Sequence, residues 1–161
     1  LGYATSDIGA HHTRAWTVAK ELVLGKDWNL EKKAELVIYH QTVRPLFDML
    51  GVCRLPWIEL GFPEQTYAEY FNAVTGLNLS LEDLLERSRA IYDITRSINV
   101  SLGISRKDDY PPDRVFDTPI STGPHAGKRL SRDEYEKILD IYYQKRGWDN
   151  NGIPGVIPEA H

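Results

Sequence analysis

The first hydrophobic pattern in the chain predicts a helix over about residues 13–24. Trp16, Ala19 and Val23 recur at the three- and four-residue spacing that places side chains on one face of a helix. Gly25 follows directly and is expected to end the helix, because glycine readily adopts the left-handed conformation found after helix C-termini.

A longer apolar stripe predicts a second helix over residues 30–47. Asn29 precedes this stripe and can cap the helix with its side-chain oxygen. Pro45 lies near the end, and a proline inside a helix removes a backbone hydrogen bond, so we expect the helix to kink or stop there. Residues 48–57 are then expected to form a loop or broken turn. The apolar positions of the stripe are Leu30, Ala34, Val37, Ile38 and Phe47.

Two more helices are predicted in the middle of the chain. The third covers Glu64–Thr75, begins after Pro63 and ends before Gly76. The fourth lies within residues 80–103, where Ser80 and Asp83 have the spacing of a capping box in which aspartate replaces glutamate. Its helical period is the strongest in the chain, with apolar residues at Leu81, Leu84, Leu85, Ile91, Ile94 and Ile98.

The last third of the chain predicts a long coil and one final helix. Residues 105–130 contain four of the nine prolines, and their aromatic and aliphatic side chains are typical of an ordered irregular coil. Ser131 and Glu134 form a capping box that opens the last helix, which ends at Gly147. No alternating run predicts a strand, so we expect an all-α class: a single irregular helical domain over residues 1–161 with long ordered loops.

The composition excludes some function classes. The chain has 161 residues, a net charge of −4 and no basic stripe, which argues against nucleic-acid binding. No apolar run approaches the roughly 20 residues of a membrane span, and the sequence has no signal-peptide pattern of a basic start and an apolar run. A single cysteine is typical of a reducing compartment, so we expect a cytoplasmic protein. The chain starts without methionine, which suggests the C-terminal part of a longer polypeptide.

That single cysteine, Cys53, lies in the stretch DMLGVC, beside Asp48 and Gly51. A lone cysteine is usually a small buried hydrophobic residue. In a glycine turn it can instead bind an iron–sulfur cluster, although a cluster normally needs four cysteines, so three would come from elsewhere. Asp48 is either a local cap or a carboxylate that accepts hydrogen bonds from the ring N–H groups of a ligand.

Two adjacent histidines, His11 and His12, follow Gly9 and precede Arg14 in the stretch SDIGAHHTRAW. Adjacent residues on a helix point about 100° apart, so these two imidazoles are unlikely ligands of one metal. One interpretation is that one histidine is exposed and the other makes a hydrogen bond in the core. The other is that one imidazole faces a site as a proton donor or acceptor.

Four segments in order resemble the C-terminal part of the tungsten-containing aldehyde:ferredoxin oxidoreductase family. DMLGVC is similar to its D-x-x-G-x-C motif, and YATSDIGAHHTRAW is similar to its segment with Gly-Ala-x-His-x-Arg-Ala. SINVSLGISRKDDYPPDR and IYYQKRGWDNNGIP resemble two further family segments. Together these motifs span almost the whole chain.

The resemblance implies a role for each candidate residue. Cys53 would be the last cysteine ligand of a 4Fe–4S cluster, and Asp48 would hydrogen-bond a pterin of a tungsten (or molybdenum) bis-pyranopterin cofactor. The main chain of Leu50, Gly51 and Val52 would also meet this pterin. His12 would face the substrate as the catalytic histidine, and His11 could exchange roles with it.

The activity implied by the resemblance is oxidation of an aldehyde to a carboxylic acid, with electrons passed to ferredoxin or a similar carrier. The N-terminal remainder of the same protein would complete the site, and both cofactors would be absent from the isolated chain. Two alternatives stay open. One is a related tungsten enzyme of the aromatic acyl-CoA reductase type, and the other is a cofactor-free helical interaction domain in which Cys53 is part of the core.

Overall fold

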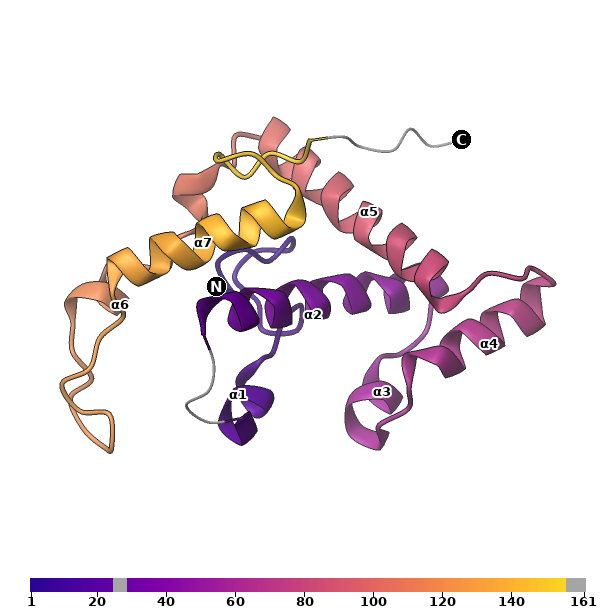
Figure 1. The fold of residues 1–161 in the computed structure, drawn as a ribbon, viewed down its shortest axis with the longest axis horizontal. Helices are drawn as coiled ribbons and strands as arrows, with labels where there is room; N and C mark the ends of the chain where they lie inside the picture. Colours follow the sequence, from indigo (N-terminus) through magenta and orange to yellow (C-terminus); the bar gives the residue numbers. More distant parts are fainter. Residues whose placement is uncertain (25–28, 156–161) are drawn as a thin grey trace.

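The computed structural model describes residues 1–24 and 29–155 and confirms the all-α class. Within these residues there is no strand, and one isolated bridge joins Trp148 and Pro154. No helix in the described part is long and apolar enough to cross a membrane. The helices, shown in Figure 1, are α1 (Val18–Leu24), α2 (Leu30–Leu50), α3 (Leu55–Leu60), α4 (Glu64–Thr75), α5 (Leu81–Ser101), the 3₁₀ helix η2 (Arg106–Asp109), α6 (Arg114–Asp117) and α7 (Arg132–Arg146).

Helix α2 is the central element, and α5 and α7 pack against it (Figure 1). As the sequence predicts, Asn29 caps α2 by accepting a hydrogen bond of 2.8 Å from the backbone N–H of Lys32. The N-terminal half of α2 joins a core that is rich in aromatic residues of α5 and α7. The buried members of this core are Ala15, Ala34, Val37, Tyr92, Phe116, Tyr135, Ile138, Leu139, Tyr142, Tyr143 and Trp148.

The C-terminal half of α2 packs in two smaller clusters against α3, α4 and α5. Val43 and Phe47 contact Tyr67, and the partly buried Trp57 and Leu50 close this cluster. The second cluster contains Leu46, Ala68 and Leu84. These contacts hold the end of α2 in place, and Cys53 lies just after this end.

Of the kink or stop expected at Pro45, the stop is wrong, because α2 continues through this proline to Leu50. Pro45 is fully buried, and Leu46 and Phe47 behind it are buried too, so packing of the helix outweighs the lost hydrogen bond. Asp48 therefore lies in the last turn of α2 and not in a loop. The loop predicted over residues 48–57 shrinks to residues 51–54, since helix α3 begins at Leu55.

The predicted start of the first helix is also wrong, since α1 begins at Val18 and not near residue 13. The segment before it is irregular, and its carbonyls bond to distant side chains: that of Thr13 accepts from Arg54 at 3.3 Å, and that of Thr5 accepts from the Tyr92 hydroxyl at 2.6 Å. Val23, expected on the buried face, is 85% exposed. The predicted end at Gly25 lies outside the described residues.

The remaining predictions of helices are confirmed. α4 has the predicted bounds and ends before Gly76. Ser80 and Asp83 form the expected capping box of α5. At the start of α7 only half of the predicted capping box forms: the Ser131 hydroxyl accepts a hydrogen bond from the N–H of Glu134. Residues 105–130 form the expected ordered coil, interrupted only by the short helices η2 and α6.

Candidate functional site

The end of α2 is a tight cap that explains the spacing of the D-x-x-G-x-C motif. Gly51 has a φ of 66°, a left-handed conformation that strains residues with a Cβ atom. Its N–H donates to the carbonyl of Asp48, and the N–H of Val52 donates to the carbonyl of Phe47 at 3.0 Å. This pair of bonds is the Schellman motif, which ends a helix and sends the chain off in a defined direction. It places Asp48 before the glycine and Cys53 after it.

Cys53 is a free, exposed cysteine, and so it is not the buried core residue of the alternative interpretation. The backbone N–H of Leu55 donates to its Sγ atom at 3.5 Å. Hydrogen bonds from backbone amides to sulfur are among the features that tune iron–sulfur clusters. The geometry thus leaves the thiol open to a ligand and already supports it from one side.

Asp48 does not act as a local cap, because its partner is Arg14, which lies 34 residues earlier in the chain. The guanidinium of Arg14 also forms an ion pair with Asp7 at 3.0 Å. Burial raises the pKa of Asp7, and the Arg14 cation opposes this rise. Asp48 remains 59% exposed, so its carboxylate can accept further hydrogen bonds from a ligand. Arg14 in this way joins the histidine segment to the end of α2.

Asp48 and Cys53 line one hollow of about 380 Å³, which we call the thiol hollow. The lining includes three arginines, Arg14, Arg44 and Arg54, and one carboxylate, Asp48. The other residues that line it are Ile8, Thr13, Phe47, Val52 and Cys53. Its lining therefore carries more positive than negative charge.

Leu50, Gly51 and Val52 offer less to a ligand than the sequence suggests. Leu50 packs its side chain into both clusters at the end of α2. The N–H groups of Gly51 and Val52 are used by the helix cap. Gly51 and Val52 are both exposed, Val52 to 43%, and their carbonyl oxygens accept no backbone hydrogen bond from the described residues.

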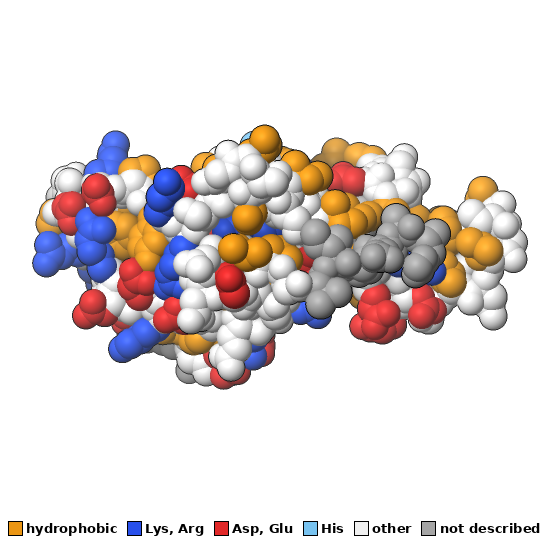
Figure 2. All heavy atoms as spheres, turned by 90° about the horizontal axis from the view of Figure 1, so that it is seen from above, with side chains coloured by type: hydrophobic (Ala, Val, Ile, Leu, Met, Phe, Trp, Pro, Cys, Tyr) orange, Lys and Arg blue, Asp and Glu red, His pale blue; other side chains and the backbone are white. Residues whose placement is uncertain are grey.

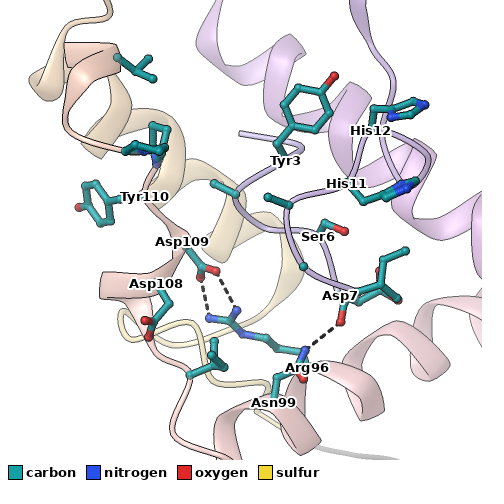
Figure 3. A pocket seen from close by; sticks show the side chains of 18 residues that line it. Tyr3, Ser6, Asp7, His11, His12, Arg96, Asn99, Asp108, Asp109 and Tyr110 are labelled. Atoms are coloured by element: carbon teal, nitrogen blue, oxygen red, sulfur yellow. Dashed lines mark hydrogen bonds and ion pairs between the residues drawn. The ribbon is translucent and has the colours of Figure 1, made fainter. Parts of the chain in front are cut away.

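His11 and His12 line a second cavity, of about 700 Å³ (Figure 3). The two histidines are not on a helix, so the prediction that their side chains point about 100° apart is wrong. Their rings stack instead, with centroids 4.9 Å apart and planes 12° from parallel. The Nδ1 atom of His11 lies 2.6 Å from the Thr13 hydroxyl and accepts from the Thr13 N–H. The ring of His12 packs edge-on against Trp16.

The opposite wall of the histidine cavity comes from residues 108–112, as Figure 3 shows. A buried ion pair holds this wall: two nitrogens of Arg96 donate to the carboxylate of Asp109 at 2.9 and 2.6 Å. The Tyr143 hydroxyl donates to the same carboxylate at 2.5 Å, and burial together with this carboxylate raises the pKa of Tyr143. The Asn99 amide donates to the carbonyl of Asp7, so α5 binds both walls.

We expect Asp109→Ala to destabilise the chain by about 3–5 kcal/mol, because it leaves the Arg96 cation buried without its partner. Arg96 is 5% and Asp109 2% exposed, so water cannot replace the lost carboxylate. Urea unfolding followed by circular dichroism measures the change.

The matched control is Asp113→Ala, which removes an ion pair with Arg132 whose carboxylate side chain is 83% exposed. This change is expected to cost less than about 1 kcal/mol. Equal losses for the two variants would contradict the structural role given to the buried pair.

Among the described residues, no group of three or more His, Cys, Asp or Glu side chains is placed to hold a metal ion. The histidine cavity and the thiol hollow are separate but neighbouring, since Ile8 lines both.

The fold and these two cavities define a class of protein: a helical domain with an open thiol and a carboxylate at one helix end and paired histidines nearby. The sequence pattern of a family described as aldehyde ferredoxin oxidoreductase, domains 2 & 3, matches residues 1–156. The chain belongs to this family.

Two curated relatives are tungsten-containing aldehyde ferredoxin oxidoreductases. That of Pyrococcus abyssi is 30% identical over 166 residues, covering 99% of this chain and 26% of the relative. That of Thermococcus kodakarensis is 30% identical over 159 residues, covering 94% of this chain and 25% of the relative. The chain therefore spans about a quarter of the length of these relatives.

One solved structure has a similar fold. It is titled as the active site complex BamBC of benzoyl coenzyme A reductase in complex with 1,5 dienoyl-CoA. The match has a TM-score of 0.63 and 21% identity, and it covers 81% of this chain and 19% of that chain. At this identity the likeness shows the fold alone.

Sequence reasoning missed two features of the site. Arg44 is 2% exposed, although the prediction from the apolar stripe did not include it among the buried residues. The Arg96–Asp109 pair joins α5 to η2, and Asp109 reads as part of a charged solvent loop in the stretch SRKDDYPPDR. The available signal for Arg44 was its place seven residues after Val37 and three before Phe47, on the same helix face.

Proposed function

We propose that this chain is part of a tungsten-dependent, iron–sulfur oxidoreductase that oxidises aldehydes to carboxylic acids and passes the electrons to ferredoxin. One observation carries the proposal: the exposed thiol of Cys53 and the half-open carboxylate of Asp48 flank one helix cap and line one hollow. Membership of the aldehyde ferredoxin oxidoreductase family supports it.

The donor set fits the cofactors of this proposal. Cys53 would hold one iron of a 4Fe–4S cluster, since its sulfur is open and faces a backbone N–H. Asp48 would accept hydrogen bonds from a pterin ring, and the carbonyls of Gly51 and Val52 offer further acceptors. The other cluster cysteines and most contacts to the cofactor would come from the N-terminal remainder of the same protein.

The cofactors would supply the redox chemistry when bound: an aldehyde and one water yield a carboxylic acid, two protons and two electrons. The chain would contribute positioning and proton transfer. In this proposal, a ring nitrogen of His12 accepts a proton from the reacting water or its adduct with the aldehyde. His11 is the less suitable group, because its Nδ1 atom is occupied by Thr13.

Exposed apolar side chains support the role given to the remainder of the protein. Soluble monomers seldom expose large apolar patches unless a partner covers them. Figure 2 shows hydrophobic atoms between the charged side chains on one face of the molecule. Among the residues that the structure describes, five large apolar ones are 70–87% exposed: Leu22, Val23, Leu60, Val74 and Leu102.

The test uses the complete protein, produced without oxygen and with tungstate. We expect tungsten, iron and sulfide to be bound, and ferredoxin to be reduced when an aldehyde is added, with the matching carboxylic acid as product. An aromatic acyl-CoA ester is the comparison substrate, offered with a strong reductant.

The outcomes separate the alternatives. Conversion of the acyl-CoA ester without oxidation of any aldehyde would place the protein with the acyl-CoA reductases and overturn the proposed reaction. A complete protein that folds and is free of metal and sulfide would instead support a helical interaction domain.

A further inference from the structure

Helix α2 carries a buried cation that the proposed chemistry does not use. Arg44 is 2% exposed, and its guanidinium carbon lies 4.9 Å from the ring centroid of Trp57. Among the residues that the structure describes, none accepts a hydrogen bond from its three side-chain nitrogens. An unpaired charge inside a protein costs several kcal/mol, so a cation in this position is expected to have an anionic partner.

The groups around Arg44 do not provide this partner. Glu64 of α4 lies beside Trp57, and its Oε1 atom already accepts hydrogen bonds from Tyr39 and from the Trp57 ring N–H. His40 lies one turn earlier on α2, and burial lowers its pKa to about 4, so it is neutral near pH 7.

The other charges of the thiol hollow add to the imbalance. Arg14 is already paired with two carboxylates, and Arg54 donates to the carbonyl of Thr13 at 3.3 Å. Burial and repulsion from Arg54 and Arg14 lower the pKa of Arg44 to about 10, so Arg44 stays charged near neutral pH. Asp48 is the one carboxylate among the lining residues, and it is bound to Arg14.

The thiol hollow therefore has the charge of an anion site. Arg44 and Cys53 both line it, so an anionic group attached to this sulfur would enter the space that Arg44 faces. An iron–sulfur cluster bound by four thiolates is such a group, and its negative charge grows by one on reduction.

We propose that Arg44 is the buried counter-cation of the cluster that Cys53 binds, and that it raises the reduction potential of that cluster. This inference rests on the proposed function. The physical reason is that a fixed positive charge in a site shielded from water stabilises the more negative, reduced form of the cluster. Arg44 is a positioning and tuning residue and not a catalytic one.

The test compares Arg44→Met with the wild type in the complete, cofactor-loaded protein. Methionine keeps much of the volume and can pack on Trp57 but removes the charge. We expect iron content to be unchanged and the reduction equilibrium of the cluster to shift about tenfold toward the oxidised form. For a one-electron couple this is about 59 mV more negative, measured by redox titration with electron paramagnetic resonance. Arg44→Lys, which keeps the charge, is expected to shift the potential less.

A second measurement uses the metal-free form of the same protein. Without the cluster, Arg44 is an unpaired buried charge, so Arg44→Met is expected to leave Tm unchanged or raise it. The matched control is Arg146→Met. Arg146 is also buried, but it donates to Gln41 at 3.0 Å and stacks on Tyr92, away from the thiol hollow. This control is expected to lower Tm in both forms and to leave the cluster potential unchanged.

An unchanged cluster potential in Arg44→Met, with iron retained, would overturn the inference while the proposed function stands. If Arg44→Met loses bound pterin and tungsten but leaves the cluster potential unchanged, the inference is also overturned. The anionic partner of Arg44 would then be a phosphate of the pterin cofactor and not the cluster. If Arg44→Met lowers the Tm of the metal-free form as much as Arg146→Met does, Arg44 has its partner within the protein and not in the cluster. A wild-type protein without any cluster would refute the proposed function itself.

Discussion

Replacement of Cys53 by alanine in the complete protein is expected to remove the iron–sulfur cluster and, with it, the reduction of ferredoxin. The cap at Gly51 fixes where the thiol points, and the exposed sulfur has no second cysteine in this chain to replace it. Changes to residues that merely support metal ligands cost about 10–100-fold in metal affinity, so loss of a ligand should cost more. Iron and sulfide analysis and the absorption of the reduced and oxidised protein measure the effect.

Val52→Ala is the matched control for this change. Val52 adjoins Cys53 and lines the same hollow, but its side chain has no ligand atom. The control is expected to keep its iron. If Cys53→Ala also keeps its full iron content and its redox signal, Cys53 is not a cluster ligand.

Replacement of His12 by alanine is expected to lower kcat for aldehyde oxidation by about 10²–10⁴-fold while tungsten stays bound, because positioned proton transfer contributes factors of this size. His12 lines the large cavity beside the thiol hollow, and its ring packs on Trp16 with no hydrogen bond among the described residues. Steady-state kinetics and tungsten analysis of the same preparation separate turnover from cofactor loss.

His11→Ala provides the comparison, since both rings line the cavity and stack on each other. The Nδ1 atom of His11 is already hydrogen-bonded to Thr13, so we expect a much smaller loss of turnover in this variant. A strong loss in His11→Ala with near-normal turnover in His12→Ala would move the proton-transfer role to His11.

The sequence predicted those helices whose ends are set by local chemistry. Ser80 with Asp83, Asn29 and Gly147 each act within one turn of the helix they cap, so a short stretch of sequence contains the whole interaction. The errors fall where distant contacts decide. Pro45 is kept helical by burial, and the segment before Val18 is held by bonds to α2 and α5.

The same distinction applies to the site. The cap between Asp48 and Cys53 is local, because Gly51 and Val52 form it with the last turn of α2, although the prediction had placed Asp48 in a loop. The partner of Asp48 was not predicted, since Arg14 reaches it from another segment. Arg44 falls on the apolar stripe of α2, so its burial could have been predicted, but its contact with Trp57 depends on the packing of α3 against α2.

The cap that ends α2 also limits which hydrogen-bonding groups of a ligand can lie against this end of the helix. Its two amide hydrogens point back into the helix, so the surface near Gly51 offers carbonyl and carboxylate oxygens. A ring edge rich in hydrogens on nitrogen would match that surface, whereas an edge made of bare oxygens would be repelled. The backbone at the end of α2 would then favour some heterocycles over others, independently of the side chains of the pocket.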